Sequence, residues 1–245
     1  MDRLIYTAMS GAKHTMERQA AVAHNLANVA TPGFRADLIA ARAVPAIGGT
    51  GLPTRAYAVE QGTGSDLTPG ILQATGRDLD VAVNGDGWLT VQTATGEAYT
   101  RNGSFEIDAN GLLKTRNGEV VLGENGPLTI PENTRVTISK DGTVTGTSLS
   151  NPTQSVQIGR LKLVNPAANE VEKGYDGLFR LRSGDAAPAS ADVKLANGML
   201  ETSNVNSVDQ LVNMVSAQRQ YDFQVRLLQT ADQNARSAAQ LIAFS

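Results

Sequence analysis

The last part of the chain runs from Ser207 to Phe244 without a glycine or a proline, and this stretch constrains the fold more than any other. Glycine and proline are the residues that most weaken a helix, so their absence predicts one continuous helix. The sequence Ser-Val-Asp-Gln from Ser207 matches a capping box and predicts where that helix begins. At 1.5 Å per residue, the helix would be about 55 Å long. A domain of this size could not cover its whole length.

Apolar residues recur in this stretch every seven positions, which is typical of a coiled coil. One heptad position is occupied by Met214, Tyr221, Leu228, Ala235 and Ile242. A second position mixes apolar and polar residues, namely Leu211, Gln218, Val225, Asp232 and Ala239. The pattern therefore predicts a coiled-coil-like seam with polar interruptions.

Residues 3–28 predict a second helix at the other end of the chain. Its narrow apolar stripe consists mostly of small or flexible side chains: Ile5, Met9, Ala12, Met16, Gln19, Ala23 and Leu26. Asn25 and Asn28 compete with the backbone for hydrogen bonds and weaken the helix near its end. Pro32 disfavours helix at Thr31, and Gly33 permits a turn, so the helix is expected to stop there.

The middle of the chain changes to the two-residue period of strands, as in the alternation of Leu79, Val81 and Val83. Further strands are expected in residues 155–164 and 177–182, and loops in residues 46–53 and 183–192. Short strands separated by Asn-Gly or Asp-Gly predict antiparallel hairpins. These dipeptides are Asn102-Gly103, Asn110-Gly111, Asn117-Gly118, Asn125-Gly126 and Asp141-Gly142.

The expected fold is α+β, with a central antiparallel all-β domain flanked by terminal helices that pair into a coiled-coil-like bundle. The expected segments are an N-terminal helix (1–30), a linker and extended segment with the first strands (31–75), the β domain (76–195), a return segment (196–206) and a C-terminal helix (207–245). A lone helix of this kind is marginal in water, so the two helices should lie side by side. Such a pair still leaves apolar surface exposed, which other copies of the chain would cover; a helical hairpin packed only on its own domain is the alternative.

Composition excludes several classes of function. The net charge is −3 and the pI is about 5.4, which is not the basic character of a nucleic-acid-binding protein. No run of 18 apolar residues is present, so the chain is not expected to be an integral membrane protein. The absence of cysteine excludes disulfides and thiolate chemistry. The N-terminus lacks the apolar core of a cleaved signal peptide, so we expect either a cytoplasmic protein or export without cleavage.

The sequence offers no convincing catalytic or metal site. His14 and His24 are the only histidines, and on one helix they lie about 15 Å apart along its axis. The fragments "NGDG" and "DANG" lack the full calcium-loop pattern and are better explained as turns. The glycine-rich "QGTGSDLTPG" does not match a phosphate-binding loop. We therefore expect no cofactor, no metal and no enzymatic activity.

Two long motifs resemble the bacterial flagellar rod and hook protein family. The first is "NLANVATPGF", with Asn25, Asn28, Thr31, Gly33 and Phe34 at the family's positions. The second begins "LETSNVNS" and continues to "QRQY", with Leu200, Glu201, Ser203, Asn204, Val205, Gln218, Arg219 and Tyr221 at the matching positions. The stretch "TGRDLDVAVNGDGW" is similar to the family's middle domain. His24 departs from the family, since many relatives carry asparagine there.

The resemblance implies a structural subunit whose terminal helices pack with those of other copies into the inner tube of a hollow shaft. The opening "MDRLIYTAMSGA" and the runs "IGRLKLV" and "DGLFRL" are most similar to a proximal-rod member; a distal-rod or hook-type subunit is the alternative within the family. The implied partners are other copies, neighbouring rod proteins and the flagellar export apparatus, with assembly in the periplasm. Outside the family, the alternative is a dimeric periplasmic binding module.

Within this interpretation, the motif from Asn25 to Gly33 ends the tube helix and turns the chain outward, and Phe34 holds the start of the outer segment. On that basis, Gly33→Val is expected to leave the isolated β domain folded and to stop incorporation into the rod.

Overall fold

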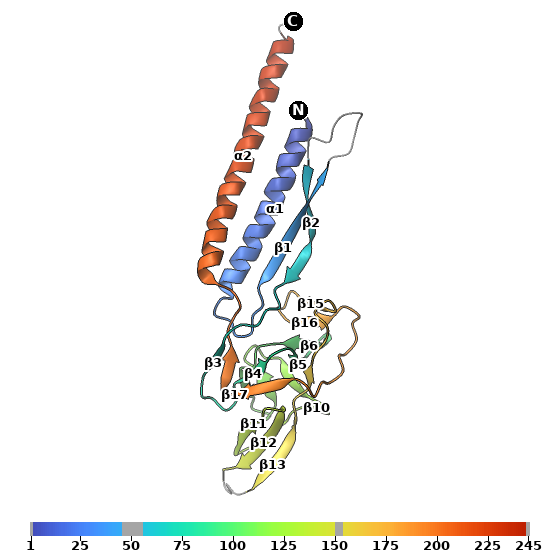
Figure 1. Ribbon diagram of the computed structural model, residues 1–245, viewed down its shortest axis with the longest axis vertical. Coiled ribbons are helices and arrows are strands. Elements are labelled where there is room, and N and C mark those ends of the chain that lie inside the picture. Colours follow the sequence, from blue (N-terminus) through green and yellow to red (C-terminus); the bar gives the residue numbers. More distant parts are fainter. Residues whose placement is uncertain (1, 46–55, 150–153, 244–245) are drawn as a thin grey trace. The chain divides into compact units, whose positions relative to one another are not determined.

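The computed structural model describes residues 2–45, 56–149 and 154–243 (Figure 1). The chain forms two compact units, and each is assembled from separate stretches of sequence. The helix unit comprises residues 1–27, 37–64 and 206–245, and the β unit comprises residues 28–36 and 65–205. The sequence analysis instead divides the chain into consecutive segments. The α+β class and the two terminal helices are confirmed.

The helix unit is built around α1 (Asp2–Ala27) and α2 (Ser207–Ala243), which lie side by side (Figure 1). Gly11 faces the side chain of Gln224, and Gln19 Nε2 donates to Gln218 Oε1 at 3.2 Å. Because the α2 partner moves back along the chain as α1 advances, the helices are antiparallel. This register leaves the last turns of α2, beyond about Ala235, without α1 alongside.

A two-stranded antiparallel ribbon completes the helix unit. It consists of β1 (Asp37–Pro45) and β2 (Ala56–Ser65), and β1 contacts α1. Along β1, Ile39 and Val44 are half-buried and Leu38 is exposed. The expected loop at 46–53 lies outside the described residues.

The largest sheet of the β unit is antiparallel and has the strand order β15-β16-β6-β5-β9-β8-β7, with β10 paired to β9 and β14 paired to β5. Its strands are β5 (Trp88–Thr93), β6 (Gly96–Thr100), β7 (Phe105–Ile107), β8 (Leu113–Thr115), β9 (Val120–Gly123), β10 (Gly126–Pro127), β14 (Leu163–Val164), β15 (Val171–Lys173) and β16 (Phe179–Leu181).

Three smaller sheets complete the β unit. One has the order β11 (Thr134–Ile138), β12 (Thr143–Ser148), β13 (Ser155–Arg160). The others are the pairs β4 (Val81–Asn84) with β17 (Lys194–Asn197), and β3 (Leu72–Ala74) with β18 (Met199–Glu201). The strands expected at 155–164 and 177–182 are thus present as β13, β14 and β16.

Four of the five predicted Asn-Gly or Asp-Gly turns join paired strands. Residues 110–111 connect β7 with β8, 117–118 connect β8 with β9, and 141–142 connect β11 with β12; Asn125 lies in the turn between β9 and β10, and Gly126 is the first residue of β10. The fifth prediction is wrong, because Asn102-Gly103 links β6 to β7 and these strands do not pair. Gly103 instead lets two backbones approach: a Cβ there would lie 1.8 Å from the Val81 carbonyl oxygen.

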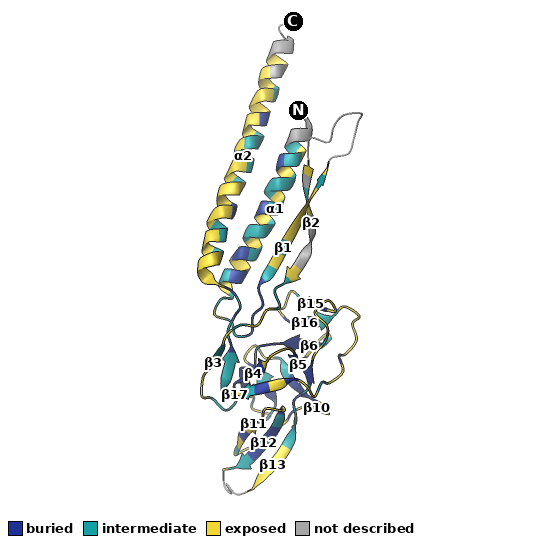
Figure 2. Ribbon diagram, in the orientation of Figure 1, coloured by how far each residue is buried: buried dark blue, intermediate teal, exposed yellow. Residues whose placement is uncertain are grey.

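The apolar core lies in the β unit, where Figure 2 shows most of the buried ribbon. Its main cluster includes the fully buried Val91, Phe105, Leu113 and Val144. A second cluster surrounds Trp88, whose ring centroid lies 4.5 Å from that of Phe179. None of the helices, searched over the described residues, has the length and apolar character needed to cross a membrane.

Candidate assembly surface and motif junction

The contact between α1 and α2 is made mainly by small residues. On α1, Ala8, Thr15 and Val22 are buried and fall seven residues apart. On α2, Ala217 and Ala231 are buried and fall two heptads apart. Small side chains allow two helices to approach closely, but they bury little apolar area. The helix pair is therefore held by a thin seam.

The seam differs from the predicted one on both helices. On α2, Met214, Tyr221, Leu228 and Ala235 are half-buried beside it, but Leu211 and Gln218 are exposed and Val225 is only half-buried. Ala217 and Ala231, one residue earlier than the predicted second position, occupy the seam instead. On α1, Met9 and Met16 are more than half exposed, whereas Ile5, Ala12 and Leu26 are half-buried. The side chain of Ile242 lies outside the described residues.

A stripe of large apolar residues faces solvent on α2. Val208, Val212, Val215 and Phe223 are each between 53% and 65% exposed. At 3.6 residues per turn, Val208 and Val215 lie on the side of α2 opposite Ala217 and Ala231, and Val212 and Phe223 lie on the adjoining flank. We call Val208, Val212, Val215 and Phe223, with the interspersed Arg219 and Arg226, the outer stripe. Contiguous exposed apolar residues are typical of interaction sites, whereas scattered ones are ordinary on a protein surface.

The start of α2 differs from the predicted capping box by one residue. Asn206 Oδ1 accepts hydrogen bonds from the Val208 and Asp209 amides at 3.0 and 3.4 Å. Asn206 is therefore the residue that caps the helix, and the assignment of that role to Ser207 is wrong. Both residues are good N-caps, so the local sequence does not distinguish them.

Asn25, from the first motif, fixes the start of β1. Its Nδ2 donates to the Asp37 carbonyl oxygen at 3.0 Å, and its Oδ1 accepts from the Asp37 amide at 2.8 Å. Next to it, His24 Nδ1 lies 2.5 Å from Asp37 Oδ2. The last turn of α1 thus holds the first residue of the ribbon by both its backbone and its side chain.

The rest of the first motif forms the turn that follows α1. The Thr31 amide donates to the Asn28 carbonyl at 3.1 Å, and the Gly33 amide donates to the Glu201 carbonyl at 2.8 Å. Gly33 has a φ of +68°, and a Cβ there would lie 2.3 Å from the Arg101 carbonyl carbon. Gly33 is therefore packed within the β unit. This contradicts the expectation that Gly33→Val would leave that domain undisturbed.

Asn204 of the second motif binds the end of the first motif through its backbone amide, which donates to the Phe34 carbonyl at 3.3 Å, and binds neighbouring segments through its side chain. Its Oδ1 accepts from the Ala36 amide at 2.8 Å, and its Nδ2 donates to the carbonyls of Asp66 and Thr68 at 2.9 and 3.1 Å. Ser203 Oγ accepts from the Val205 amide at 3.2 Å. The half-buried Leu200 lies in β18. One amide side chain thus holds two other segments of the β unit.

An apolar cluster supports this junction. Phe34 and Ala36 pack with Val205, and Val29 lies against them. Lys173 Nζ lies 3.9 Å from the centre of the Phe34 ring and donates to the Arg35 carbonyl at 2.8 Å. Phe34 and Val205, each from one of the two motifs, therefore share one small core.

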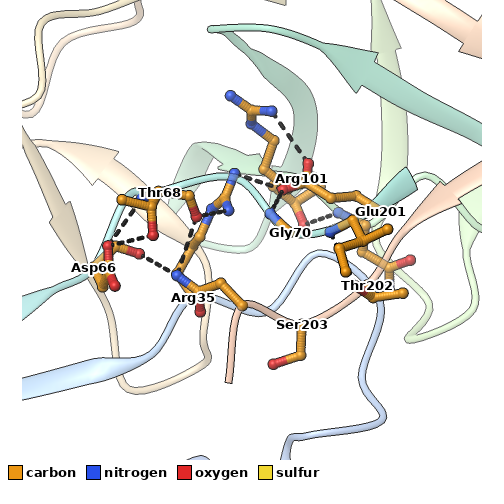
Figure 3. A network of polar contacts seen from close by, with 12 residues as sticks. Arg35, Asp66, Thr68, Gly70, Arg101, Glu201, Thr202 and Ser203 are labelled. Atoms are coloured by element: carbon orange, nitrogen blue, oxygen red, sulfur yellow. Dashed lines mark hydrogen bonds and ion pairs between the residues drawn. The ribbon is translucent and has the colours of Figure 1, made fainter. Parts of the chain in front are cut away.

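Beside that small core lies a buried cluster of three charged residues (Figure 3). Glu201 Oε1 lies 2.7 Å from Arg35 Nη2, and Glu201 Oε2 lies 3.1 Å from Arg101 Nη1. Glu201 Oε1 also accepts from the Gly70 amide at 2.8 Å, and Arg35 Nη1 donates to the Thr68 carbonyl. We call Arg35, Arg101 and Glu201 the Glu201 cluster.

The Glu201 cluster is short of negative charge. The side chains of Arg35 and Glu201 are fully buried, and that of Arg101 is 5% exposed. Burial lowers the pKa of both guanidinium groups, and the Glu201 carboxylate opposes this shift. Arginine nevertheless keeps its proton in proteins, so two cations surround one anion. Arg101 also lies 5.3 Å from the centre of the Trp88 ring, which offers further stabilisation of the cation.

Glu201 belongs to the second motif, but no sequence pattern points to a role for Arg35 or Arg101. Arg35 directly follows the first motif, which was the only local signal available. The pairing of Arg101 with Glu201 joins residues 100 positions apart. Periodicity and turn patterns are local, so they do not predict a contact between residues so far apart in the sequence.

The "DANG" fragment behaves as a turn. Asp108 Oδ1 accepts from the amides of Asn110 and Leu112 at 2.8 and 2.9 Å, and Asp108 Oδ2 pairs with Lys114 Nζ at 2.6 Å. Among the residues that the structure describes, no three histidine, aspartate or glutamate side chains lie close enough together to bind a metal ion.

Three family models match successive parts of the chain. Residues 5–35 match the flagella basal body rod protein family. Residues 82–146 match the flagellar hook protein FlgE/F/G D1 domain, and residues 196–241 match the flagellar basal body rod FlgEFG protein C-terminal family. The first and last of these regions contain the two motifs that meet at the junction.

Full-length relatives show the same likeness. The chain is 45% identical to the flagellar basal-body rod protein FlgF of Escherichia coli and 44% identical to that of Salmonella typhimurium, over 100% of both chains in each case. It is 33% identical to the flagellar basal-body rod protein FlgG of Buchnera aphidicola, over 90% of this chain and 92% of the relative.

Proposed function

We propose that this chain, which belongs to the family of flagellar basal-body rod proteins, is a structural subunit of the proximal rod of the bacterial flagellum. It self-assembles through its terminal helices into the hollow shaft that transmits torque and through which exported subunits pass. The role is architectural and non-enzymatic.

The outer stripe of α2 is the observation that carries this proposal. The seam with α1 uses a different side of α2, so the stripe has its own side chains free for another helix. The two helices also differ in length, and the last turns of α2 extend beyond α1. The stripe leaves apolar side chains uncovered, and the overhang leaves helix turns without a neighbouring helix; further copies would cover both.

The segments of the chain take distinct places in this assembly. The terminal helices, residues 1–30 and 207–245, form the inner tube, and the β domain of residues 76–195 forms the outer layer. The partners are other copies of the chain, the proximal rod proteins FlgB and FlgC, the distal rod protein FlgG and the flagellar type III export apparatus. Assembly takes place in the periplasm after export without a cleaved signal peptide.

The higher identity to FlgF favours the proximal rod over the distal rod or a hook-type subunit, because the FlgG relative is more distant. A dimeric binding module is not favoured, since the likeness to rod proteins extends over the full chain.

The test changes the outer stripe without touching the seam. Val212→Asp and Phe223→Asp each place a charge where a neighbouring helix would bury it, and an unpaired buried charge is costly. Gln220→Asp is the matched control, because Gln220 is exposed on the same helix but lies off the stripe. Leu228→Asp would not separate the two surfaces, because Leu228 lies beside the seam and a charge there would also disturb the contact with α1.

Incorporation is measured as the amount of the variant in isolated basal bodies, and folding of the purified protein by circular dichroism. We expect both stripe variants to fold as the parent does and to lose incorporation by about tenfold or more, whereas the control is retained. Normal incorporation of Val212→Asp and Phe223→Asp would refute the assembly surface.

A further inference from the structure

The Glu201 cluster gathers the segments by which the chain passes between its two units. The chain changes unit after residues 27, 36, 64 and 205. On the β-unit side, these passages adjoin residues 28–36, the segment that starts at residue 65, and the return segment up to residue 205. Arg35, Gly70 and Glu201 belong to these three segments, and all three meet at the Glu201 carboxylate (Figure 3).

The same carboxylate ties these segments to the main sheet. Arg101 follows the last residue of β6 and lies beside Trp88 of β5. Its contact with Glu201 Oε2 is therefore the ionic link between the three passage segments and the core. Asn204, three residues after Glu201, adds the neutral hydrogen bonds to Ala36, Asp66 and Thr68.

Glu201 is the carboxylate that contacts both arginines, and Asp66 and Asp86 add only smaller electrostatic contributions to Arg35 and Arg101 respectively. Two buried guanidinium groups need an anion, and a carboxylate is the group that offers both charge and enough acceptors. Two donor atoms of the cluster, Arg35 Nε and Arg101 Nε, already find no acceptor within the described chain. Without the Glu201 carboxylate, the guanidinium groups of Arg35 and Arg101 need water in its place. Because the Arg35 side chain is fully buried, it can reach water only if residues 28–36 detach from the rest of the β unit.

We propose that Glu201 controls a separate closing step of the β unit, in which residues 28–36, residues 65–70 and the return segment become ordered together on a core that is already folded. Glu201 acts as a positioning residue in this step. The core strands with their fully buried residues, such as Phe105 and Leu113, do not depend on it.

The position of Glu201 in the chain gives this step a direction. Glu201 lies 100 residues after Arg101 and 166 residues after Arg35, beyond every strand of the main sheet. A chain that has placed all of those strands still lacks the anion that Arg35 and Arg101 require. The passage segments therefore stay open until the return segment arrives.

Hydrogen exchange measured by mass spectrometry on the full-length chain tests this step. Glu201→Gln keeps the shape of the side chain and removes its charge. We expect exchange in residues 28–36 and 65–70 to rise together by about tenfold or more, while exchange in residues 105–123 stays within about twofold of the parent. Asp80→Asn is the control: Asp80 is also a buried carboxylate of the β unit, held by Thr75, Arg77 and Ser104. It should not raise exchange in residues 28–36.

Two outcomes of this measurement would overturn the proposal. One is a rise confined to the return segment, and the other is an equal rise over the passage segments and the core strands. A second variant covers the case in which Glu201→Gln does not fold. Arg35→Met added to Glu201→Gln removes one of the unpaired cations and should restore folding and part of the protection of residues 65–70. The proposal would also be overturned if adding Arg35→Met failed to restore either folding or the protection of residues 65–70.

Discussion

The two units of this protein bury very different side chains. The β unit encloses large apolar residues such as Phe105, Leu113 and Leu161, which are at most 1% exposed. In the helix unit, the buried apolar residues among those described are Ala8, Val22, Ala217 and Ala231. The β unit therefore contains its own driving force for folding, whereas the helix unit leaves much of its apolar surface to be covered by something else.

The exposed residues reinforce the contrast. The large apolar residues of α2 that face solvent, including Val212 and Phe223, are the type that the β unit places inside. A protein whose function needs only the β unit would have no reason to keep such a helix. The difference indicates that the β unit is stable by itself, whereas the helix unit gains stability when other helices cover its apolar residues.

The largest expected effect is in the core of the β unit. Phe105→Ala should lower the free energy of unfolding of that unit by about 4 kcal/mol, because it removes a fully buried aromatic ring and leaves a cavity. Trp88, the single tryptophan, lies in the β unit, so its fluorescence reports denaturant unfolding there. Val22→Ala in the helix seam is the comparison and should cost about 1.5 kcal/mol. Equal costs would remove the contrast between the units.

The second effect concerns the junction. Gly33→Ala should destabilise the β unit by about 3 kcal/mol, because the new Cβ meets the Arg101 backbone and the φ is positive. Gly76→Ala is the matched control: its φ is +71° but no atom lies within 4 Å of the new Cβ. The control should cost about 1 kcal/mol, which is the conformational part alone. If Gly33→Ala costs no more than Gly76→Ala by Trp88 fluorescence, the close approach at Gly33 is not present.

A third, smaller effect isolates the helix unit. Ala217→Leu overfills the seam and should destabilise the helix pair by about 2 kcal/mol. The helical signal in far-UV circular dichroism should then be lost at lower denaturant concentration, with the transition seen by Trp88 unchanged. Ser216→Leu, on an exposed neighbour, should leave both signals unaltered. An equal shift of the Trp88 transition would mean that the helix unit and the β unit do not unfold separately.

The smallest effect is a pH dependence at the surface of the β unit. A hydrogen bond from Arg180 holds the pKa of Asp176 below its usual value, and partial burial opposes that shift. A lowered folded-state pKa gives stability that is present above the unfolded-state pKa of about 4 and disappears as the pH falls through the folded-state pKa.

Asp176→Asn should therefore cost about 0.5 kcal/mol at neutral pH, a small value because solvent screens a half-exposed pair. The difference from the parent should shrink as the pH falls through the lowered folded-state pKa of Asp176. Arg180→Met should give the same pH profile in Trp88-detected unfolding, since it removes the other partner. A difference that persists unchanged in acid would exclude the ion pair as its cause.

The sequence was sufficient to predict the elements that depend on local patterns. The terminal helices were predicted within one or two residues, because apolar residues recur at heptad spacing in both, and residues 207–244 also lack glycine and proline. The turn residues at 110–111, 117–118 and 141–142 were predicted because Asn-Gly and Asp-Gly suit tight turns. The order and pairing of sheets such as β4 with β17 depend on distant partners and could not be predicted.

Two errors have clear physical reasons. The seam on α2 was placed one residue too late, because Ala217 and Ala231 give a weaker apolar signal than Leu211 and Val225. Small residues in a helix–helix seam let the two helix backbones approach closely, and a hydropathy pattern does not reveal this property. The Glu201 cluster was missed because charged residues are usually exposed, and nothing local shows that Arg35 and Arg101 are buried.

Asn25 illustrates why one residue type is required at the end of α1. Its amide copies a peptide plane, presenting an oxygen to the Asp37 amide and an NH₂ to the Asp37 carbonyl. Aspartate has the same outline but would set an acceptor oxygen, in place of the NH₂ donor, against the Asp37 carbonyl oxygen, and glutamine would overshoot by one methylene. The first residue of the ribbon is thus paired with a side chain in the way that a strand pairs with its neighbour, so a single carboxamide fixes where the ribbon begins beside α1.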